Sequence, residues 1–386
     1  FTQAIARRGY LYINQGYYNM ARRITFYFIK MGYVLCFIFA AAFLLFNVFF
    51  GVFPFRIALV IVLYFLFLSA IWLSVTIMYI LQKELAFTGL LAGGIFVVFI
   101  LFKIRGYDII VSQVIALIIV AAAGDILALY YFKREEKKAE KGVVTPLLPR
   151  TSITIYTVLP YFAYGFLYFT FLFSDRIIAW STNSIYMPYL IWFRGPYELG
   201  LDLALLTLVL PMGFIEVVVN ELMANLEADQ KNCMGRKTRL LNHRYVALYL
   251  GRTAAVTLFV IINGVLVYYV VRYFNLNPLP AFQGNLLNNE ATHFVFIMAI
   301  LAYTVLSIGL LNTLILFSLS QPEMVGESIL TALTVNLVVG FPLSRWFDHS
   351  FAVIGLLLGS AVFLILTGRQ VLKVLKKLDY YLYTAS

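Results

Sequence analysis

The sequence predicts an all-α protein that crosses a membrane about ten times. Of its 386 residues, 62% are apolar and only 12% are charged, whereas an ordinary soluble domain has roughly 45–50% and about 25%. The apolar residues are gathered in continuous runs of the length that a helix needs to cross about 30 Å of bilayer hydrocarbon. A membrane barrel would instead show segments of about ten residues with alternating polarity.

Ten runs meet this length requirement. They cover residues 24–50, 57–81, 86–102, 109–132, 153–180, 197–222, 246–271, 294–319, 328–344 and 350–368. Lys and Arg set the orientation, because short cytoplasmic segments carry an excess of them. If the first residues are cytoplasmic, most of the 29 Lys and Arg residues fall on the cytoplasmic side. We therefore expect a multi-pass membrane protein with both visible termini in the cytoplasm.

The charged segment KREEKKAEKGVVTPLLPR, residues 133–150, divides the chain. Its charges and its two prolines are typical of a solvated linker between helices. We predict an N-terminal lobe over residues 1–132, a cytoplasmic linker over 133–150 and a C-terminal lobe of six helices over 151–386. We expect two lobes of six helices around a central cavity, which is 12 helices in all. Because only four spans precede the linker, the first two helices of the N-terminal lobe are expected to be largely missing here. Such internal repetition is common in secondary transporters.

The span 153–180 contains an adjacent pair of opposite charges, Asp175 and Arg176. Helical spacing places Tyr161, Tyr164 and Tyr168 on the face of Asp175. A charge at a helix centre costs about 2.5–3.5 kcal/mol on insertion scales, so each group needs water or a partner. Two interpretations stay open: a structural ion pair, or side chains that line a substrate path. Tyrosine rings stack on sugar faces while their hydroxyls donate hydrogen bonds, which suggests a carbohydrate passenger.

The next span, 197–222, carries Glu198, Asp202, Glu216 and Asn220 at offsets that share one helical face. This holds if the helix continues through Pro211, which removes one backbone hydrogen bond. Carboxylates that faced lipid would be costly. We therefore predict that this face lines a water-filled cavity.

Asp125 is the acid of the span 109–132. It is interpreted either as a proton or ion coupling site or as the acceptor of a hydrogen bond between packed helices. Near the end of the chain, GLLLGSAVFLILTGR is rich in small residues and predicts a closely packed helix face.

The sequence contains no recognised catalytic or cofactor motif. It lacks G-x-x-x-x-G-K-[ST], H-E-x-x-H, G-x-S-x-G and kinase signatures, and its two cysteines and three histidines are too few for a disulfide framework or a structural zinc site. We expect a transporter without a cofactor or metal. A less favoured alternative is a glycan polymerase or ligase that uses Glu290 and His293 of the loop 272–293. The net charge of +11 predicts contact with anionic lipid headgroups rather than nucleic acid.

Two stretches carry a resemblance to a known family. Residues 161–181, which are rich in aromatic side chains and end in SDRIIAWS, resemble the seventh helix of the PelG exopolysaccharide exporters. The opening FTQAIARRGYLYINQG resembles their second helix and the basic loop after it. The layout of helices is similar to that of the multidrug/oligosaccharidyl-lipid/polysaccharide (MOP) flippase superfamily, to which these exporters belong.

This resemblance implies a transporter of the bacterial inner membrane that moves a polysaccharide or a lipid-linked saccharide to the periplasm, for exopolysaccharide secretion and biofilm formation. It implies a cytoplasmic glycosyltransferase and membrane scaffold proteins as partners. The family's polymer is rich in amino sugars and partly cationic, so the acids of the span 197–222 would suit it electrostatically. The alternative is a small-molecule or drug antiporter on the same scaffold, in which Asp125 or Asp175 couples transport to an ion.

Overall fold

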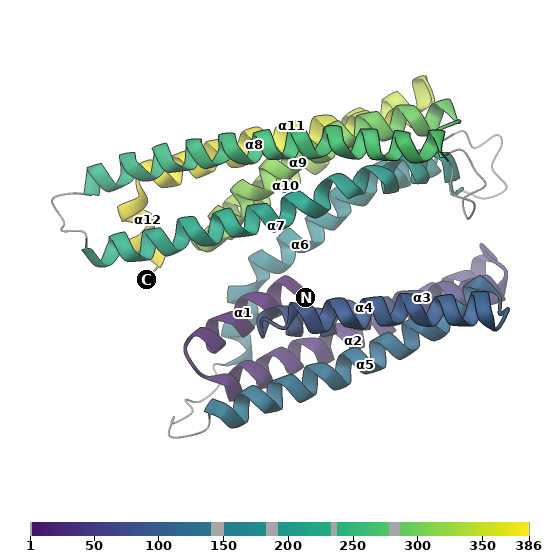
Figure 1. Ribbon diagram of the computed structural model, residues 1–386, viewed down its shortest axis with the longest axis horizontal. Coiled ribbons are helices and arrows are strands. Elements are labelled where there is room, and N and C mark those ends of the chain that lie inside the picture. Colours follow the sequence, from purple (N-terminus) through teal and green to yellow (C-terminus); the bar gives the residue numbers. More distant parts are fainter. Residues whose placement is uncertain (1, 140–149, 183–191, 233–237, 278–285, 386) are drawn as a thin grey trace. The chain divides into compact units, whose positions relative to one another are not determined.

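The computed structural model describes residues 2–139, 150–182, 192–232, 238–277 and 286–385, all helices and connecting turns without a strand (Figure 1). The helices are α1 (Thr2–Asn14), α2 (Tyr18–Phe50), α3 (Phe55–Ile80), α4 (Glu84–Phe99), α5 (Ile109–Ala139), α6 (Thr151–Trp180), α7 (Gly195–Asn232), α8 (Thr238–Leu276), α9 (Glu290–Ser318), α10 (Pro322–Trp346), α11 (Ala352–Lys376) and α12 (Leu378–Ala385). A π-helical turn, Ile100–Ile104, continues α4, and a 3₁₀ turn, His349–Phe351, precedes α11.

Ten helices in the described ranges are long and apolar enough to cross a membrane. This confirms the prediction of an all-α, multi-pass protein and the number of spans. The twelve-helix architecture and the central cavity stay predictions. Helices α7 and α8 have 38 and 39 residues. At 1.5 Å per residue each is almost 60 Å long, roughly twice the thickness of bilayer hydrocarbon. The apolar runs 197–222 and 246–271 identified only part of these helices.

The chain forms two compact units, Phe1–Gly165 and Phe166–Ser386, and the boundary falls within α6. Helices that pack together within each unit run alongside one another (Figure 1). Of the predicted linker, residues 133–139 belong to α5, and 140–149 lie outside the described residues.

The first unit has its main core where α1 packs against α2 and α3. Ile5, Phe28, Ile77 and Phe132 are all buried in one apolar cluster. A smaller cluster, which includes Ile71, joins α3 to α5. These buried side chains recur at helical spacing, so each helix buries one face and leaves the others apolar and exposed, as expected of helices in a bilayer.

The turn between α2 and α3 shows how a span ends. Gly51 adopts a left-handed conformation with φ of 60° and donates its N–H to the carbonyl of Asn47 at 2.8 Å. The Asn47 side chain accepts the Phe53 N–H at 2.7 Å and donates to the Phe53 carbonyl at 3.0 Å. Glycine tolerates this positive φ, and the buried asparagine pairs backbone groups that would otherwise lack partners.

The second unit is built around α9, which has buried residues along its length from Thr292 to Leu316. Small residues bring α10 and α11 into close contact. A Cβ atom on Gly355 would lie 2.5 Å from the Asn336 carbonyl oxygen, and one on Gly359 would lie 2.8 Å from that of Ala332. The closely packed face predicted from GLLLGSAVFLILTGR is confirmed, because only glycine leaves room for backbones this close.

Helix α7 continues through Pro211. Proline has no N–H for the carbonyl four residues earlier, which is that of Thr207. The Asn263 side chain of α8 donates to this carbonyl at 2.9 Å. A neighbouring helix thus supplies the hydrogen bond that proline removes, which is how spanning helices tolerate proline.

Candidate functional site

Asp175 is completely buried near the end of α6. Its Oδ2 atom accepts a hydrogen bond of 2.7 Å from the hydroxyl of Tyr197, which is itself fully buried in the first turn of α7. The other carboxylate oxygen, Oδ1, has no hydrogen-bond partner among the described residues. A buried oxygen without a hydrogen bond lowers the free energy of unfolding. Asp175 therefore destabilises the fold at this position.

Arg176, the next residue of α6, binds two acids of α7. One guanidinium nitrogen pairs with Glu198, and Nη2 pairs with Asp202 Oδ1 at 2.9 Å. Trp180 donates its indole N–H to Glu198 Oε1 at 2.7 Å. The planar guanidinium fork can serve two carboxylates at once, which an ammonium group does less well. Arg176 therefore fixes the positions of both acids.

We call Asp175, Arg176, Glu198 and Asp202 the charged cluster. Glu198 and Asp202 bind the guanidinium directly, and with Asp175 the cluster has three carboxylates to one guanidinium, so it has an excess of negative charge when all four groups are ionised. The side chains of Arg176 and Glu198 are 9% and 7% exposed, whereas that of Asp202 is 60% exposed. The carboxylate of Asp202 is thus accessible, and the buried Arg176 that binds it fixes its position.

The charged cluster lies near the ends of its two helices. Arg176 is four residues before the end of α6, and Glu198 is in the first turn of α7. At the N-terminus of α7, the helix dipole favours the negative charge of Glu198. This placement reduces the cost of the charges compared with the centre of a span.

Helix α10 anchors the end of α6 that carries the cluster. Arg345 donates to the carbonyls of Ile178 and Ser181 at 3.2 and 3.1 Å, two of the groups that a helix end leaves without partners. Asn336 donates to Ser174 Oγ at 2.8 Å, directly beside Asp175. These contacts hold the backbone from which Asp175 and Arg176 project.

The predicted aromatic residues of α6 differ in exposure. Tyr161 and Tyr164 are buried at 6% and 4% exposure, and Tyr168 is half-buried. Tyr161 and Tyr164 belong to the first unit and Tyr168 to the second. A role for these three rings in sugar binding stays a prediction.

Glu216 and Asn220 lie farther along α7 than Asp202. Fourteen residues separate Asp202 from Glu216, which is about 21 Å along a helix. Glu216 is half-buried and Asn220 is exposed. The structure therefore brings Asp175, Arg176, Glu198 and Asp202 together and leaves Glu216 and Asn220 outside this cluster.

Asp125 of α5 is half-buried and accepts hydrogen bonds of 3.0 and 2.8 Å from the Tyr33 hydroxyl of α2. Asp125 therefore accepts a hydrogen bond between packed helices, which is one of the two interpretations of this residue from the sequence. A role in ion coupling stays a prediction. Glu290 and His293, the residues of the enzyme alternative, line a cavity of about 320 Å³ at the start of α9.

Within the described ranges, no group of three or more His, Cys, Asp or Glu side chains is arranged to hold a metal ion. The fold and the cluster together define a multi-span membrane protein with a fixed group of charges in its second unit. No family model, curated protein or solved structure matches the chain.

Proposed function

We propose that the protein is an inner-membrane transporter that moves a polysaccharide or a lipid-linked saccharide from the cytoplasm to the periplasm for exopolysaccharide secretion. The proposal is supported by the ten candidate spans and by the resemblance of residues 161–181 to polysaccharide exporters. The observation that carries it is the exposed carboxylate of Asp202, which is held in place by the buried Arg176.

This arrangement suits a cationic sugar polymer. Arg176 orients Asp202 through a hydrogen bond of 2.9 Å. The guanidinium is itself held by Glu198 and by the ring of Phe173, whose centroid lies 5.2 Å from Arg176 Cζ. A fixed carboxylate attracts cations without first having to be ordered, and this attraction is stronger beside a low-dielectric wall than in bulk water. In this proposal Asp202 contacts the passenger, and Asp175, Arg176 and Glu198 position it.

The export test compares Asp202→Asn with the wild type in cells that secrete the polymer, at equal abundance of the protein in the membrane. A lost charge contact of about 1.4 kcal/mol corresponds to a tenfold change in affinity, so we expect secretion to fall several-fold. Glu227→Gln is the matched control, because Glu227 is an exposed acid of the same helix. Unchanged secretion by Asp202→Asn would remove Asp202 from the path.

A second candidate function rests on Asp175. Its buried Oδ1 atom has no hydrogen-bond partner among the described residues, which is the state expected of a carboxylate that binds a proton or a cation during transport. Under this proposal the protein is an antiporter of small molecules. The test is uptake of a small organic cation by reconstituted vesicles under an imposed proton or sodium gradient. Gradient-driven uptake that Asp175→Asn abolishes would favour the antiporter, and uptake independent of both gradients would exclude it.

A further inference from the structure

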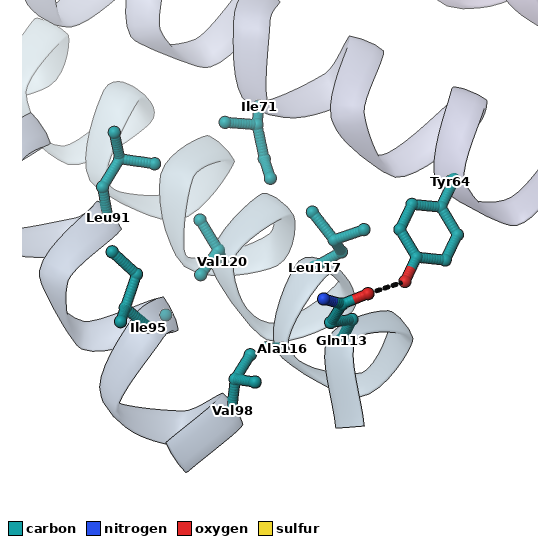
Figure 2. Close-up of a pocket in the computed structure, with 10 residues that line it drawn as sticks. Tyr64, Ile71, Leu91, Ile95, Val98, Gln113, Ala116, Leu117 and Val120 are labelled. Atoms are coloured by element: carbon teal, nitrogen blue, oxygen red, sulfur yellow. Dashed lines mark hydrogen bonds between the residues drawn. The ribbon is translucent and has the colours of Figure 1, made fainter. Parts of the chain in front are cut away.

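A groove runs along the first unit between α3, α4 and α5. It has a volume of about 280 Å³, and its walls include Leu91 and Ile95 of α4 and Leu117 and Val120 of α5 (Figure 2). Helix α4 approaches α5 closely at Gly94, where a Cβ atom would lie 2.5 Å from Val120 Cγ2.

One end of the groove is polar. The Tyr64 hydroxyl of α3 donates to Gln113 Oε1 of α5 at 2.5 Å, and the Gln113 amide nitrogen points away from Tyr64 (Figure 2). The other lining residues are apolar apart from this pair. The groove therefore matches a molecule that is apolar for most of its length and carries hydrogen-bond acceptors at one end.

Beyond the polar end, the unit presents three bases. Arg56 lies in the first turn of α3, and Lys103 and Arg105 follow the last groove residue of α4, Val98, by five and seven positions. All three are exposed, and no ion pair to any of them is found in the described parts of the chain. The nearby acid Asp108 accepts a hydrogen bond from the Ile110 N–H through its Oδ2 atom at 3.0 Å.

The surroundings of these bases match the level of lipid headgroups. Tyr107, which is 52% exposed, lies in the same turn, and tyrosine is enriched where membrane meets water. The π-helical turn Ile100–Ile104 ends α4 at this level. Three bases against one acid give a net positive charge, which attracts an anionic phosphate.

We infer that this groove binds one acyl chain of an anionic glycerophospholipid, with the phosphate held by Arg56, Lys103 and Arg105 and the ester carbonyls near Gln113. Apolar walls take the chain, the amide nitrogen of Gln113 is a donor for a carbonyl, and the bases neutralise the headgroup. The inference concerns the first unit alone and is independent of the transported substrate.

The test is site-specific photo-crosslinking. Ile95 is 72% exposed and lines the groove, so its replacement by p-benzoylphenylalanine places a crosslinker beside the chain without filling the core. The full chain is reconstituted in vesicles with equal amounts of phosphatidylglycerol and phosphatidylcholine, irradiated, and analysed by mass spectrometry. We expect adducts of phosphatidylglycerol to exceed those of phosphatidylcholine. Adducts in the proportions of the vesicle, or adducts to another segment of the chain, would overturn the inference.

Two pairs of variants sharpen this measurement. One basic residue near an anionic surface corresponds to about a fivefold preference, so Lys103→Gln with Arg105→Gln should reduce the excess of phosphatidylglycerol by at least about fivefold. Lys133→Gln with Arg134→Gln, at the other end of α5, should leave it unchanged. Leu117→Trp should fill the groove and return the adducts to the proportions of the vesicle, whereas Ile118→Trp, at a residue that does not line the groove, should keep the excess of phosphatidylglycerol. An unchanged lipid ratio in the first pair would contradict the role of the bases.

Discussion

Each unit contains an acid within a candidate span, Asp125 in the first and Asp175 in the second, and the two acids are accommodated differently. In the first unit, the carboxylate of Asp125 is half-buried and is bonded by the single hydroxyl of Tyr33. In the second unit, Asp175 is completely buried and accepts a hydrogen bond from Tyr197, and the adjacent Arg176 binds Glu198 and Asp202. A partly solvated acid needs one donor, whereas several acids near one another need a shared cation because burial raises the cost of every unpaired charge.

The difference also concerns what each arrangement can do. The Asp125 contact joins α2 to α5, and its geometry is explained by packing alone. The charged cluster has more acids than bases, an exposed carboxylate and a buried oxygen without a partner in the described residues. Packing does not require these features, and the proposed function rests on them.

Removal of the Arg176 guanidinium, which Glu198 and Asp202 share, should change the stability most. Arg176→Met would leave Glu198 and Asp202 without their guanidinium partner. Removal of one member of a buried ion pair typically costs about 3–5 kcal/mol, and we expect a loss of this size in the free energy of unfolding. Thermal unfolding in detergent, followed by size-exclusion chromatography, measures it.

Arg252→Met is the matched control, because Arg252 pairs with Glu221 and both side chains are more than 40% exposed. An exposed pair contributes about 0–1 kcal/mol. Equal losses from the two substitutions would mean that the charged cluster is not buried. Arg176→Lys should recover only part of the stability, since an ammonium lacks the planar fork.

The next test removes one donor to Asp175. Tyr197→Phe keeps the ring and deletes the hydroxyl that bonds Oδ2 at 2.7 Å. Because the carboxylate is completely buried, it would keep its desolvation cost, and we expect a loss of about 1–3 kcal/mol. The same thermal assay applies, and the double substitution with Asp175→Asn should cost less than the sum of the single substitutions.

The corresponding change in the first unit is Tyr33→Phe. Asp125 is only half-buried, so water can replace part of the lost hydrogen bond, and we expect a loss of about 0.5–1.5 kcal/mol. A loss larger than that of Tyr197→Phe would reverse the comparison between the units.

The sequence predicted the spans well because length and apolarity are local properties of the chain. It also indicated the acids of the charged cluster, since charges within apolar runs are conspicuous. It grouped Glu216 and Asn220 with Asp202 because helical spacing identifies a shared face but gives no limit along the axis.

The partners of the cluster could not be predicted from periodicity. Tyr197 and Trp180 donate to its acids, and Asn336 and Arg345 of α10 hold the part of α6 that carries it. Contacts of this kind depend on how helices pack. One signal was available: Asp175 and Arg176 are adjacent, as are Tyr197 and Glu198. Adjacent residues diverge by about 100° on a helix, so the two members of each pair point in different directions and need separate partners. That argument predicts partners on other helices without identifying them.

The smallest effect is expected for an acid outside the spans, Asp348, which lies between α10 and the 3₁₀ turn. Partial burial opposes its ionisation, but His349 Nδ1 at 2.7 Å and the Ser350 hydroxyl at 3.0 Å outweigh this and lower the pKa of the Asp348 carboxyl. A lowered pKa in the folded state means that ionised Asp348 stabilises the fold above its unfolded pKa of about 4, and that this contribution is lost as the pH falls through the folded value.

Asp348→Asn tests this contribution. The Asp348 side chain is 42% exposed, so solvent screens the interaction and the effect on unfolding should stay below about 1 kcal/mol. We expect the melting temperature of the variant to be slightly lower than that of the wild type at pH 6, and the two to converge at acidic pH, because protonated Asp348 also lacks the charge. A difference that persists unchanged at acidic pH would mean that the carboxylate charge is not its source. In that case the shape and the hydrogen bonds of the 3₁₀ turn would account for the difference in stability. Asp348 would then act through hydrogen bonding, as Asp125 does, and not through its charge, as the acids of the charged cluster do.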